Sequence, residues 1–401
     1  MTIDLSNDTG VKQTPGKIWS KSFIILFFAN MAFNMGLNMS NSLLSVYSYS
    51  LGASAATIGI VASSQGISAI TLRFISAPIM DTYNRKYLVM FAALMMSIAF
   101  FGFSLATSIP VVIAFRLLQG AAMAFGNASC LAMVADLLPK DRYNSGLGYY
   151  SMAQVACSAV GPSVGLALSD WGGFRLTYTL TSCIMLLAAF LTFMIKLDFK
   201  KTKKLKFSFH NAIATESFLP VGIQIIQLLG GSGMSFLIIY AREQGVTGNI
   251  GLYFTTSAIT MLLTRPLIGR LTDKYGLVKI AIPASICNIL SLLIVARATT
   301  LPILLTAAFV SAFGQGACQP ALQALTMKTA TPERRGAASS TNYIGMDIGT
   351  MVGPVIAGNV AQTYGYYTMW HVLVAPIIAG SFALFFARNA IKRIEERFAS
   401  R

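Results

Sequence analysis

Long apolar runs follow one another along almost the whole chain and are separated by short polar stretches. Each run has about 18 residues or more, the length that an α-helix needs to cross the hydrocarbon core of a bilayer. The pattern therefore predicts an all-α membrane protein with twelve transmembrane helices. The expected spans are 22–48, 55–79, 87–108, 110–135, 146–168, 174–195, 219–241, 250–268, 277–297, 302–327, 338–361 and 367–387.

The polar stretches predict how the chain is divided. Residues 1–17 have no apolar run followed by a small-residue cleavage site, so we interpret them as an N-terminal tail and not as a signal peptide. A Lys-rich segment at 196–218 separates six spans from six and is interpreted as a linker. We expect one six-helix bundle at 18–195, a second at 219–387, and a C-terminal tail at 388–401.

Composition and charge place this chain in a membrane. It is 55% hydrophobic and 11% charged, whereas soluble domains are usually about a quarter charged. The net charge is +16, but most Lys and Arg residues fall on one side of the predicted spans, and the other side has only Arg175, Arg242 and Arg297. The positive-inside rule then predicts a multi-pass plasma-membrane protein with both termini and the linker in the cytoplasm. Because the charge follows the topology, we expect contact with membrane lipids and none with nucleic acid.

Residues that carry enzyme chemistry are scarce. The five cysteines fall inside predicted spans at unrelated spacings, which predicts neither a disulfide framework nor a metal site. The chain has two histidines, no HExxH motif and no GxxxxGK[ST] phosphate loop. We therefore expect no enzyme, no metal and no cofactor, and no ATP hydrolysis by this chain. An integral-membrane enzyme that uses the asparagines of the first span is a distant alternative.

The two halves of the sequence repeat each other. A shift of 192 residues superposes polar and small residues of the first six spans on equivalent residues of the last six. Such a repeat predicts two pseudo-symmetric six-helix bundles, the arrangement of carriers that rock two bundles around a central site. The matched pairs are Arg73 with Arg265, Asp81 with Asp273, and Gly161-Pro162 with Gly353-Pro354.

Four motifs make the chain, beyond its N-terminal tail, resemble the major facilitator superfamily. The loop signature GxLxDRxGRR is matched after span 8 and, in degraded form, after span 2. The signature RxxQG lies in span 4, and span 5 carries GPxxG, which resembles the motif of the antiporters in this superfamily. The matching residues are Gly269, Leu271, Asp273, Gly276 and Lys279; Asp81, Arg85 and Lys86; Arg116, Gln119 and Gly120; and Gly161, Pro162 and Gly165.

This resemblance implies a monomeric secondary transporter of the same fold. The leading hypothesis is a proton-coupled antiporter that exports a drug, a metabolite or a metallophore-like solute by alternating access. The first alternative is a facilitator or a proton symporter that imports a polar solute such as a sugar or an organic acid. The second is a membrane sensor or a lipid scramblase on the same fold, because fold does not fix function.

The resemblance also implies a conformational latch at the ends of the spans. A carboxylate satisfies the free N–H groups at the start of a neighbouring helix, where the helix dipole favours negative charge. The family pattern implies that Asp81 caps the start of span 11 and that Asp273 caps the start of span 5. It also implies that Arg85 pairs with Asp136. The alternative is that these charges only enforce topology.

Small residues recur every four positions on spans 5 and 11, and each set contains a proline. In the family, Gly161 and Pro162, together with Gly353 and Pro354, are interpreted as a helix hinge and a seal between the halves. Close helix packing without any gating role would give the same spacing.

Two ionisable residues fall well inside spans. Arg116 lies about six residues into span 4 and Asp347 about ten residues into span 11. A charge at such a depth must face the bundle interior or water, and it marks a functional site by default. We expect Arg116 to contact the substrate or a proton network, and Asp347 to carry the proton if transport is coupled to protons. Purely structural hydrogen bonding is the alternative for both.

Amide side chains complete the predicted pathway for a small-molecule substrate and protons. Three asparagines at a four-residue spacing form a polar stripe on one face of span 1. Such amides bind a substrate without a charge, but they also bond one helix to another in lipid. The candidates are Asn30, Asn34, Asn38, Gln119, Gln154 and Gln227.

Overall fold

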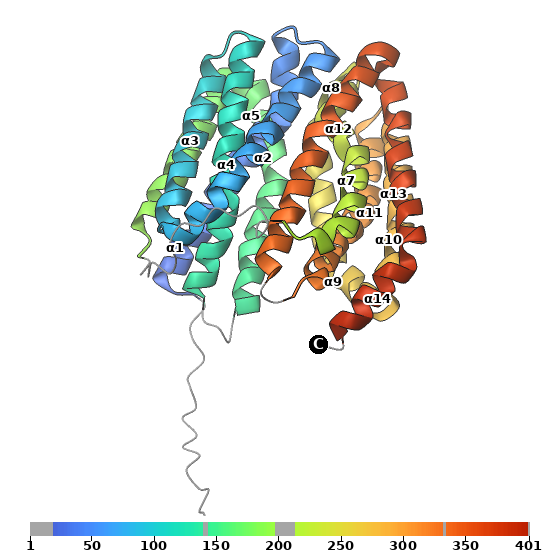
Figure 1. The fold of residues 1–401 in the computed structure, drawn as a ribbon. Helices are drawn as coiled ribbons and strands as arrows, with labels where there is room; N and C mark the ends of the chain where they lie inside the picture. Colours follow the sequence, from blue (N-terminus) through green and yellow to red (C-terminus); the bar gives the residue numbers. More distant parts are fainter. Residues whose placement is uncertain (1–18, 139–142, 197–212, 332–333, 400–401) are drawn as a thin grey trace, which may run out of the picture.

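The computed structural model describes residues 19–138, 143–196, 213–331 and 334–399. Within these ranges the chain forms α-helices and short 3-10 turns, and no strand occurs among them. Figure 1 shows the helices of the first half beside those of the second. The predicted N-terminal tail at 1–17 lies outside the described residues, as does most of the predicted linker.

The first half begins at Lys21, close to the predicted start of span 1. Its helices are α1 (Lys21–Ser50), α2 (Ala55–Thr82), α3 (Arg85–Leu105), α4 (Ile109–Leu137) and α5 (Tyr143–Met194).

The second half starts inside the segment that was predicted to be linker, because a short 3-10 turn leads directly into its first span. The predicted C-terminal tail also contains a helix. The elements are η2 (Thr215–Ser217), α7 (Phe218–Gly231), η3 (Ser232–Phe236), α8 (Leu237–Glu243), α9 (Leu252–Tyr275), α10 (Leu277–Val295), α11 (Leu301–Thr329), α12 (Arg335–Val372), α13 (Val374–Phe386) and α14 (Arg388–Ala399).

Polar side chains in the short connections define where helices begin. Ser54 precedes α2, and its hydroxyl accepts the Thr57 backbone N–H at 3.3 Å. The Asn84 side chain precedes α3 and accepts the Lys86 backbone N–H at 3.0 Å. Each cap satisfies one of the N–H groups that a helix start leaves without a partner.

Two of the long helices are divided at a glycine into segments that correspond to predicted spans. Nine segments of the described residues are long and apolar enough to cross a membrane. Two of them, Tyr149–Met194 with 46 residues and Ala337–Phe386 with 50, are long enough to cross twice. Gly173 and Gly365 divide them with φ of 75° and 81°, a conformation that favours glycine. With α9, which carries several charges, the described residues then contain twelve candidate membrane-spanning segments, a number that agrees with the prediction.

The repeat of the sequence is visible in the structure. The two dividing glycines, Gly173 and Gly365, are separated by the same 192 residues as the sequence repeat and have nearly the same backbone angles. In the first half, the hydroxyl of Tyr47 on α1 donates to the carbonyl oxygen of Phe103 at 3.0 Å. In the second half, the hydroxyl of Tyr240 on α8 donates to the carbonyl oxygen of Ala296 at 2.7 Å. Each half therefore ties its first span to the end of its third span by the same contact.

The two halves pack together at one end of the molecule. We call the end where α1 begins and α14 lies the terminal end, and the end where α1 stops the opposite end (Figure 1). One apolar cluster, which includes Leu44 and Trp370, joins both halves in the middle and at the opposite end. Towards the terminal end the described apolar residues form separate clusters, around Tyr150 in the first half and Ile391 in the second. The described residues of the two halves therefore pack against each other most extensively in the middle and towards the opposite end.

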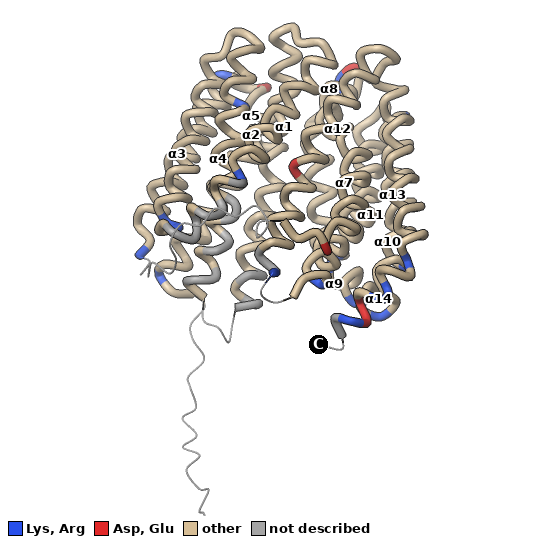
Figure 2. The backbone as a smooth tube through the Cα atoms, viewed as in Figure 1, with Lys and Arg blue, Asp and Glu red and all other residues tan. Residues whose placement is uncertain are grey.

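The outer surface is suited to lipid. Large apolar side chains face outwards along the helices, among them Phe28, Leu263 and Phe386. Figure 2 shows that charged residues gather at the two ends of the bundle and are sparse between them. A wide apolar belt of this kind is expected where helices contact acyl chains.

Candidate functional site

A cavity of about 520 Å³ lies between the two halves. Its walls come from α1, α2 and α4 of the first half, and from α7 and α10 to α13 of the second. Cavities of this size accept drug-sized molecules. Side chains of both repeats therefore converge on one space, as a carrier of alternating access requires.

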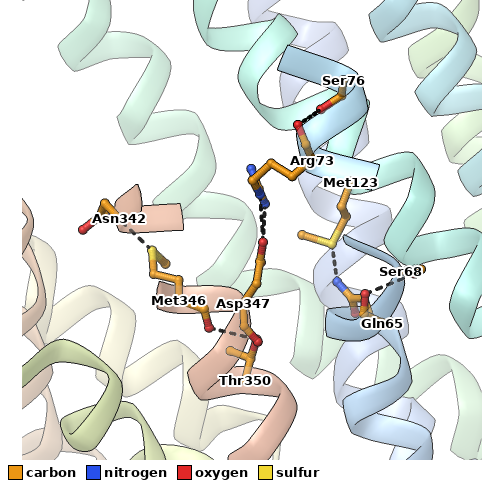
Figure 3. Close-up of polar contacts among 9 residues, drawn as sticks. All are labelled: Gln65, Ser68, Arg73, Ser76, Met123, Asn342, Met346, Asp347 and Thr350. Carbon is orange, nitrogen blue, oxygen red and sulfur yellow. Dashed lines mark hydrogen bonds and ion pairs between the residues drawn. The ribbon is translucent and has the colours of Figure 1, made fainter. Parts of the chain in front are cut away.

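An ion pair joins the two halves at the wall of this cavity. Arg73 on α2 donates from Nη2 to Asp347 Oδ2 at 2.7 Å and from Nε to the same oxygen at 2.8 Å. Their side chains are only 8% and 17% exposed. Figure 3 shows the two side chains pointing at each other from α2 and α12. The sequence prediction placed Asp347 in the pathway, and the structure places it in the cavity wall.

The surroundings of Asp347 explain why the two helices come so close. A Cβ atom added at Gly66 on α2 would lie 3.1 Å from the Asp347 carbonyl oxygen and 2.9 Å from Met351 Cβ. Glycine at this position therefore allows close contact between α2 and α12. The guanidinium of Arg73 also lies 5.1 Å from the ring centre of Tyr343, within the range of a cation–π interaction.

Arg116 also lines the cavity, but its hydrogen-bond partners are neutral. Its Nη1 donates to Asn41 Oδ1 at 2.8 Å and to Gln119 Oε1 at 2.6 Å. Arg116 is 7% exposed and Gln119 is fully buried. Gln119 therefore lies behind Arg116 and supports it, while Arg116 and Asn41 reach the cavity.

Amides of the second half line the same space. Gln227 on α7 faces the cavity and donates from Nε2 to Ser285 Oγ at 3.2 Å. Gln224, one turn earlier, lines the cavity as well, and neither atom of its amide group has a hydrogen-bond partner among the described residues. These two residues place donors and acceptors opposite the polar groups of the first half.

The asparagine stripe lies outside the cavity lining. Asn30 is buried and donates to the Tyr150 carbonyl oxygen on α5 at 3.3 Å. Asn34 donates to the Asn30 carbonyl oxygen at 2.9 Å, and Asn38 donates to that of Asn34 at 2.8 Å. In this conformation the stripe therefore bonds within α1 and to α5. Gln154 on α5 is half-buried and also lies outside the lining.

The predicted hinge residues lie at close helix contacts. A Cβ added at Gly161 would lie 2.8 Å from Asn38 Cβ on α1, and one at Gly353 would lie 2.6 Å from Ser232 Cβ. Pro162 and Pro354 lie inside helices that continue through them. The small residues at these positions permit close packing, and their role as a hinge stays a prediction.

The predicted latch falls mostly outside the described side chains. The backbones of Asp81 and Asp273 lie in the last turns of α2 and α9 and not in the loops that follow. The side chains of these two residues and of Asp136 are outside the part of the structure that is described. Arg85 is half-buried at the first position of α3. The latch therefore stays a prediction.

Polar contacts hold the halves together near the opposite end. The hydroxyl groups of Ser163 on α5 and Thr255 on α9 lie 2.8 Å apart, and Asn249 Nδ2 donates to the Ser163 carbonyl oxygen at 3.0 Å. An exposed ion pair between Arg242 Nη2 and Asp170 Oδ1 at 2.8 Å also joins the two halves. These contacts agree with a cavity that is closed on this side.

Three further residues line the cavity: Arg73, Asn41 and Gln224. Asn41 and Gln224 belong to the amides of spans 1 and 7, whereas Arg73 had no predicted role in the pathway. In the sequence analysis Arg73 appears only as the residue that the internal repeat matches with Arg265. The sequence did contain a signal for this role. Arg73 is an intramembrane charge opposite in sign to Asp347, and charges within a membrane pair with one another.

Among the described residues, no group of three or more His, Cys, Asp and Glu side chains is placed to hold a metal ion. The polar groups of the cavity are amides, hydroxyls and the three charged side chains already described. This chemistry binds and orients a ligand by hydrogen bonds and charge.

Comparison with known proteins identifies the family. The family model described as Major Facilitator Superfamily matches residues 26–240 and 221–400. The multi-drug resistance efflux pump PmrA of Streptococcus pneumoniae serotype 4 is 26% identical over 370 residues, which cover 88% of this chain and 92% of the relative. The multidrug resistance protein MdtG of Escherichia fergusonii is 28% identical over 331 residues, which cover 79% of this chain and 80% of the relative.

Solved structures share the fold at low sequence identity. The nucleoside transporter NupG superposes with a TM-score of 0.73 at 14% identity, over 91% of this chain and 98% of that one. A POT family transporter in complex with 5-aminolevulinic acid superposes with a TM-score of 0.77 at 14% identity, over 95% and 98% of the two chains. These similarities show the fold alone. The identity of the substrate has to be argued from the residues that line the cavity.

Proposed function

The chain belongs to the Major Facilitator Superfamily and is a secondary transporter, and we propose that it exports small molecules in exchange for protons. The names of the relatives support this direction, because both describe proteins of multidrug resistance and one is called an efflux pump. The GPxxG motif at Gly161, Pro162 and Gly165 supports it as well.

The observation that carries the proposal is the Arg73–Asp347 ion pair between the two halves. Asp347 is the only carboxylate that lines the cavity among the described residues. A proton on Asp347 would neutralise it and weaken its attraction to Arg73. The same proton would thereby weaken one of the contacts between the bundles, so that protonation and conformation become coupled.

We propose that the terminal end faces the cytoplasm. The basic residues of α14 lie at this end, as do Lys274 at the end of α9 and Lys279 at the start of α10. The positive-inside rule requires such a basic end on the cytoplasmic face. Substrate would enter the cavity from the cytoplasm, while the contacts around Ser163 and Thr255 close the other side. The protein would act as a monomer in the plasma membrane, with lipid around its apolar belt.

The two bundles, 18–195 and 219–387, would rock about the cavity during transport. Gly161, Pro162, Gly353 and Pro354 would let α5 and α12 bend, and Asp81 and Asp273 would latch the terminal end when it closes. In the proposed pathway Arg116, Gln227 and Asp347 contact substrate or protons directly, with Gln119 behind them. When the bundles move, water would reach the asparagines of α1 and Gln154.

Transport by the purified protein in liposomes tests the direction of coupling. Liposomes with an acidic interior are mixed with fluorescent drug-like probes of positive, neutral and negative charge. An antiporter accumulates a probe inside as protons leave, and the accumulation disappears when nigericin collapses the gradient. Probe movement in the same direction as protons would instead establish the symporter, and probe movement that ignores the gradient would establish a facilitator.

A further inference from the structure

The guanidinium of Arg116 has no carboxylate partner among the described residues. Its Nη1 donates to two neutral amide oxygens, those of Asn41 and Gln119, and its Nε has no hydrogen-bond partner among the described residues. The residue is buried, with only 7% of its surface exposed. A buried cation of this kind is costly unless an anion compensates it.

The charge balance of the cavity leaves this cation in excess. Three charged side chains of the described residues line the cavity: Arg73, Arg116 and Asp347. Arg73 and Asp347 neutralise each other through two hydrogen bonds to one carboxylate oxygen. The remaining charge of the lining is therefore the single positive charge of Arg116.

Gln224 provides a second and independent indication of a ligand. This residue lines the cavity from the other half, is 1% exposed, and neither its Nε2 nor its Oε1 has a hydrogen-bond partner among the described residues. A buried amide without partners costs free energy, and bound ligand or water usually supplies the missing hydrogen bonds. Among the described residues, the cavity thus has a cation without an anionic partner on α4, and an amide without hydrogen-bond partners on α7.

The rest of the lining combines apolar side chains with neutral amides and hydroxyls, such as those of Gln65, Asn288 and Gln315. Side chains from both halves, among them Leu44, Met123, Leu228, Leu292 and Ile377, face the same space. A ligand that fills it must therefore carry an apolar body between its polar groups.

We propose that the cavity binds amphipathic organic anions, which place a carboxylate, phosphonate or sulfonate on Arg116, an apolar body against the aliphatic lining and a hydrogen-bonding group at Gln224. This proposal names the substrate class of the proposed exporter, and it rests on the proposed export function. Binding itself needs no proton gradient. It is therefore measured separately from transport.

A pair of probes that differ only in charge tests the proposal. Dansyl-leucine carries a carboxylate, and dansyl-leucinamide replaces it by a neutral amide on the same apolar body. Dansyl fluorescence is titrated with the purified full-length protein in nanodiscs at neutral pH. Because hydrogen bonds to charged groups are stronger than neutral ones, we expect the Kd of the acid to be about tenfold or more below that of the amide.

Arg116→Gln removes the charge and should raise the Kd of dansyl-leucine by about tenfold or more, while the Kd of dansyl-leucinamide stays within about twofold. Arg116→Lys keeps a positive charge and should keep part of the preference for the acid. Arg297→Gln, which removes an exposed arginine outside the cavity, is the matched control and should leave both Kd values unchanged.

Equal binding of the acid and the amide to the native protein would overturn the proposal. An equal loss of both ligands in Arg116→Gln would do so as well, because it would show that Arg116 supports packing alone. If the acid is preferred through Arg116 but no gradient moves any probe, the binding class stands and the export function fails. If the gradient moves cationic or neutral probes and the acid is not preferred, export stands and the anion class fails.

Discussion

Arg73 and Asp347 are 274 residues apart in the sequence, yet Nη2 of the arginine lies 2.7 Å from Oδ2 of the aspartate. The pair crosses the boundary between the two bundles at the depth of the central cavity (Figure 3). Any conformational change that separates α2 from α12 at this level must break it. The pair is therefore placed to link the charge state of the cavity to the arrangement of the bundles.

Removing one partner of this pair should destabilise the protein strongly. Arg73→Gln leaves a buried carboxylate without its cation, and loss of one partner from a buried pair typically costs about 3–5 kcal/mol. We expect a lower thermal unfolding midpoint in detergent for Arg73→Gln. The double variant Arg73→Gln/Asp347→Asn should recover much of the loss, because neither charge then remains uncompensated. A double variant as unstable as the sum of the single variants would show that the two residues do not interact.

The exposed pair between Arg242 and Asp170 is the natural comparison. Its side chains are 42% and 62% exposed, and exposed ion pairs contribute about 0–1 kcal/mol. Asp170→Asn should therefore shift the unfolding midpoint far less than Arg73→Gln in the same assay. A shift of similar size would mean that burial does not set the strength of the Arg73–Asp347 pair.

Gly59 on α2 should tolerate no side chain in this conformation. A Cβ there would lie 2.3 Å from the Pro354 carbonyl oxygen on α12, so the two helices would have to separate near the opposite end. Overpacking of this kind costs about 1–3 kcal/mol. Gly59→Ala should lower the unfolding midpoint. Gly222→Ala on α7 has no atom within 4 Å of the added Cβ and should be neutral or slightly stabilising, because alanine favours a helix.

Replacing Gln224 by an apolar residue should stabilise the ligand-free protein and weaken ligand binding. Its buried amide lacks partners among the described residues, and such a group costs about 1–3 kcal/mol. Gln224→Leu should therefore raise the unfolding midpoint of the ligand-free protein and weaken the binding of dansyl-leucine. Gln227→Leu removes a side chain that bonds Ser285, and it should not raise the midpoint. A lower midpoint for Gln224→Leu would show that water or another group already satisfies this amide.

The spans and the internal repeat could be predicted from the sequence because both are local patterns of hydrophobicity and spacing. The shift of 192 residues also relates Gly173 to Gly365, which have nearly identical backbone angles in the structure. The position of Asp347 in the cavity wall could be anticipated, because a carboxylate near the middle of a span must face the interior.

The ion pair of Asp347 with Arg73 could not be predicted from such local patterns. The repeat matches Arg73 with Arg265, but Arg73 is 7% exposed against α12, whereas Arg265 is exposed. The two repeats have diverged at this position, and only the packing of α2 on α12 shows which arginine meets the aspartate. The asparagines of span 1 illustrate the same limit, since spacing predicts a common face but not whether that face meets a cavity or a neighbouring helix.

Asp347→Asn in liposomes tests the central claim most directly. The variant keeps the size of the side chain but cannot release or bind the proton. Two rates are measured with one probe: accumulation driven by a pH gradient, and exchange of labelled for unlabelled probe at equal pH. Proton coupling through Asp347 predicts that gradient-driven accumulation is lost while exchange is retained. Accumulation at the native rate in the variant would contradict it.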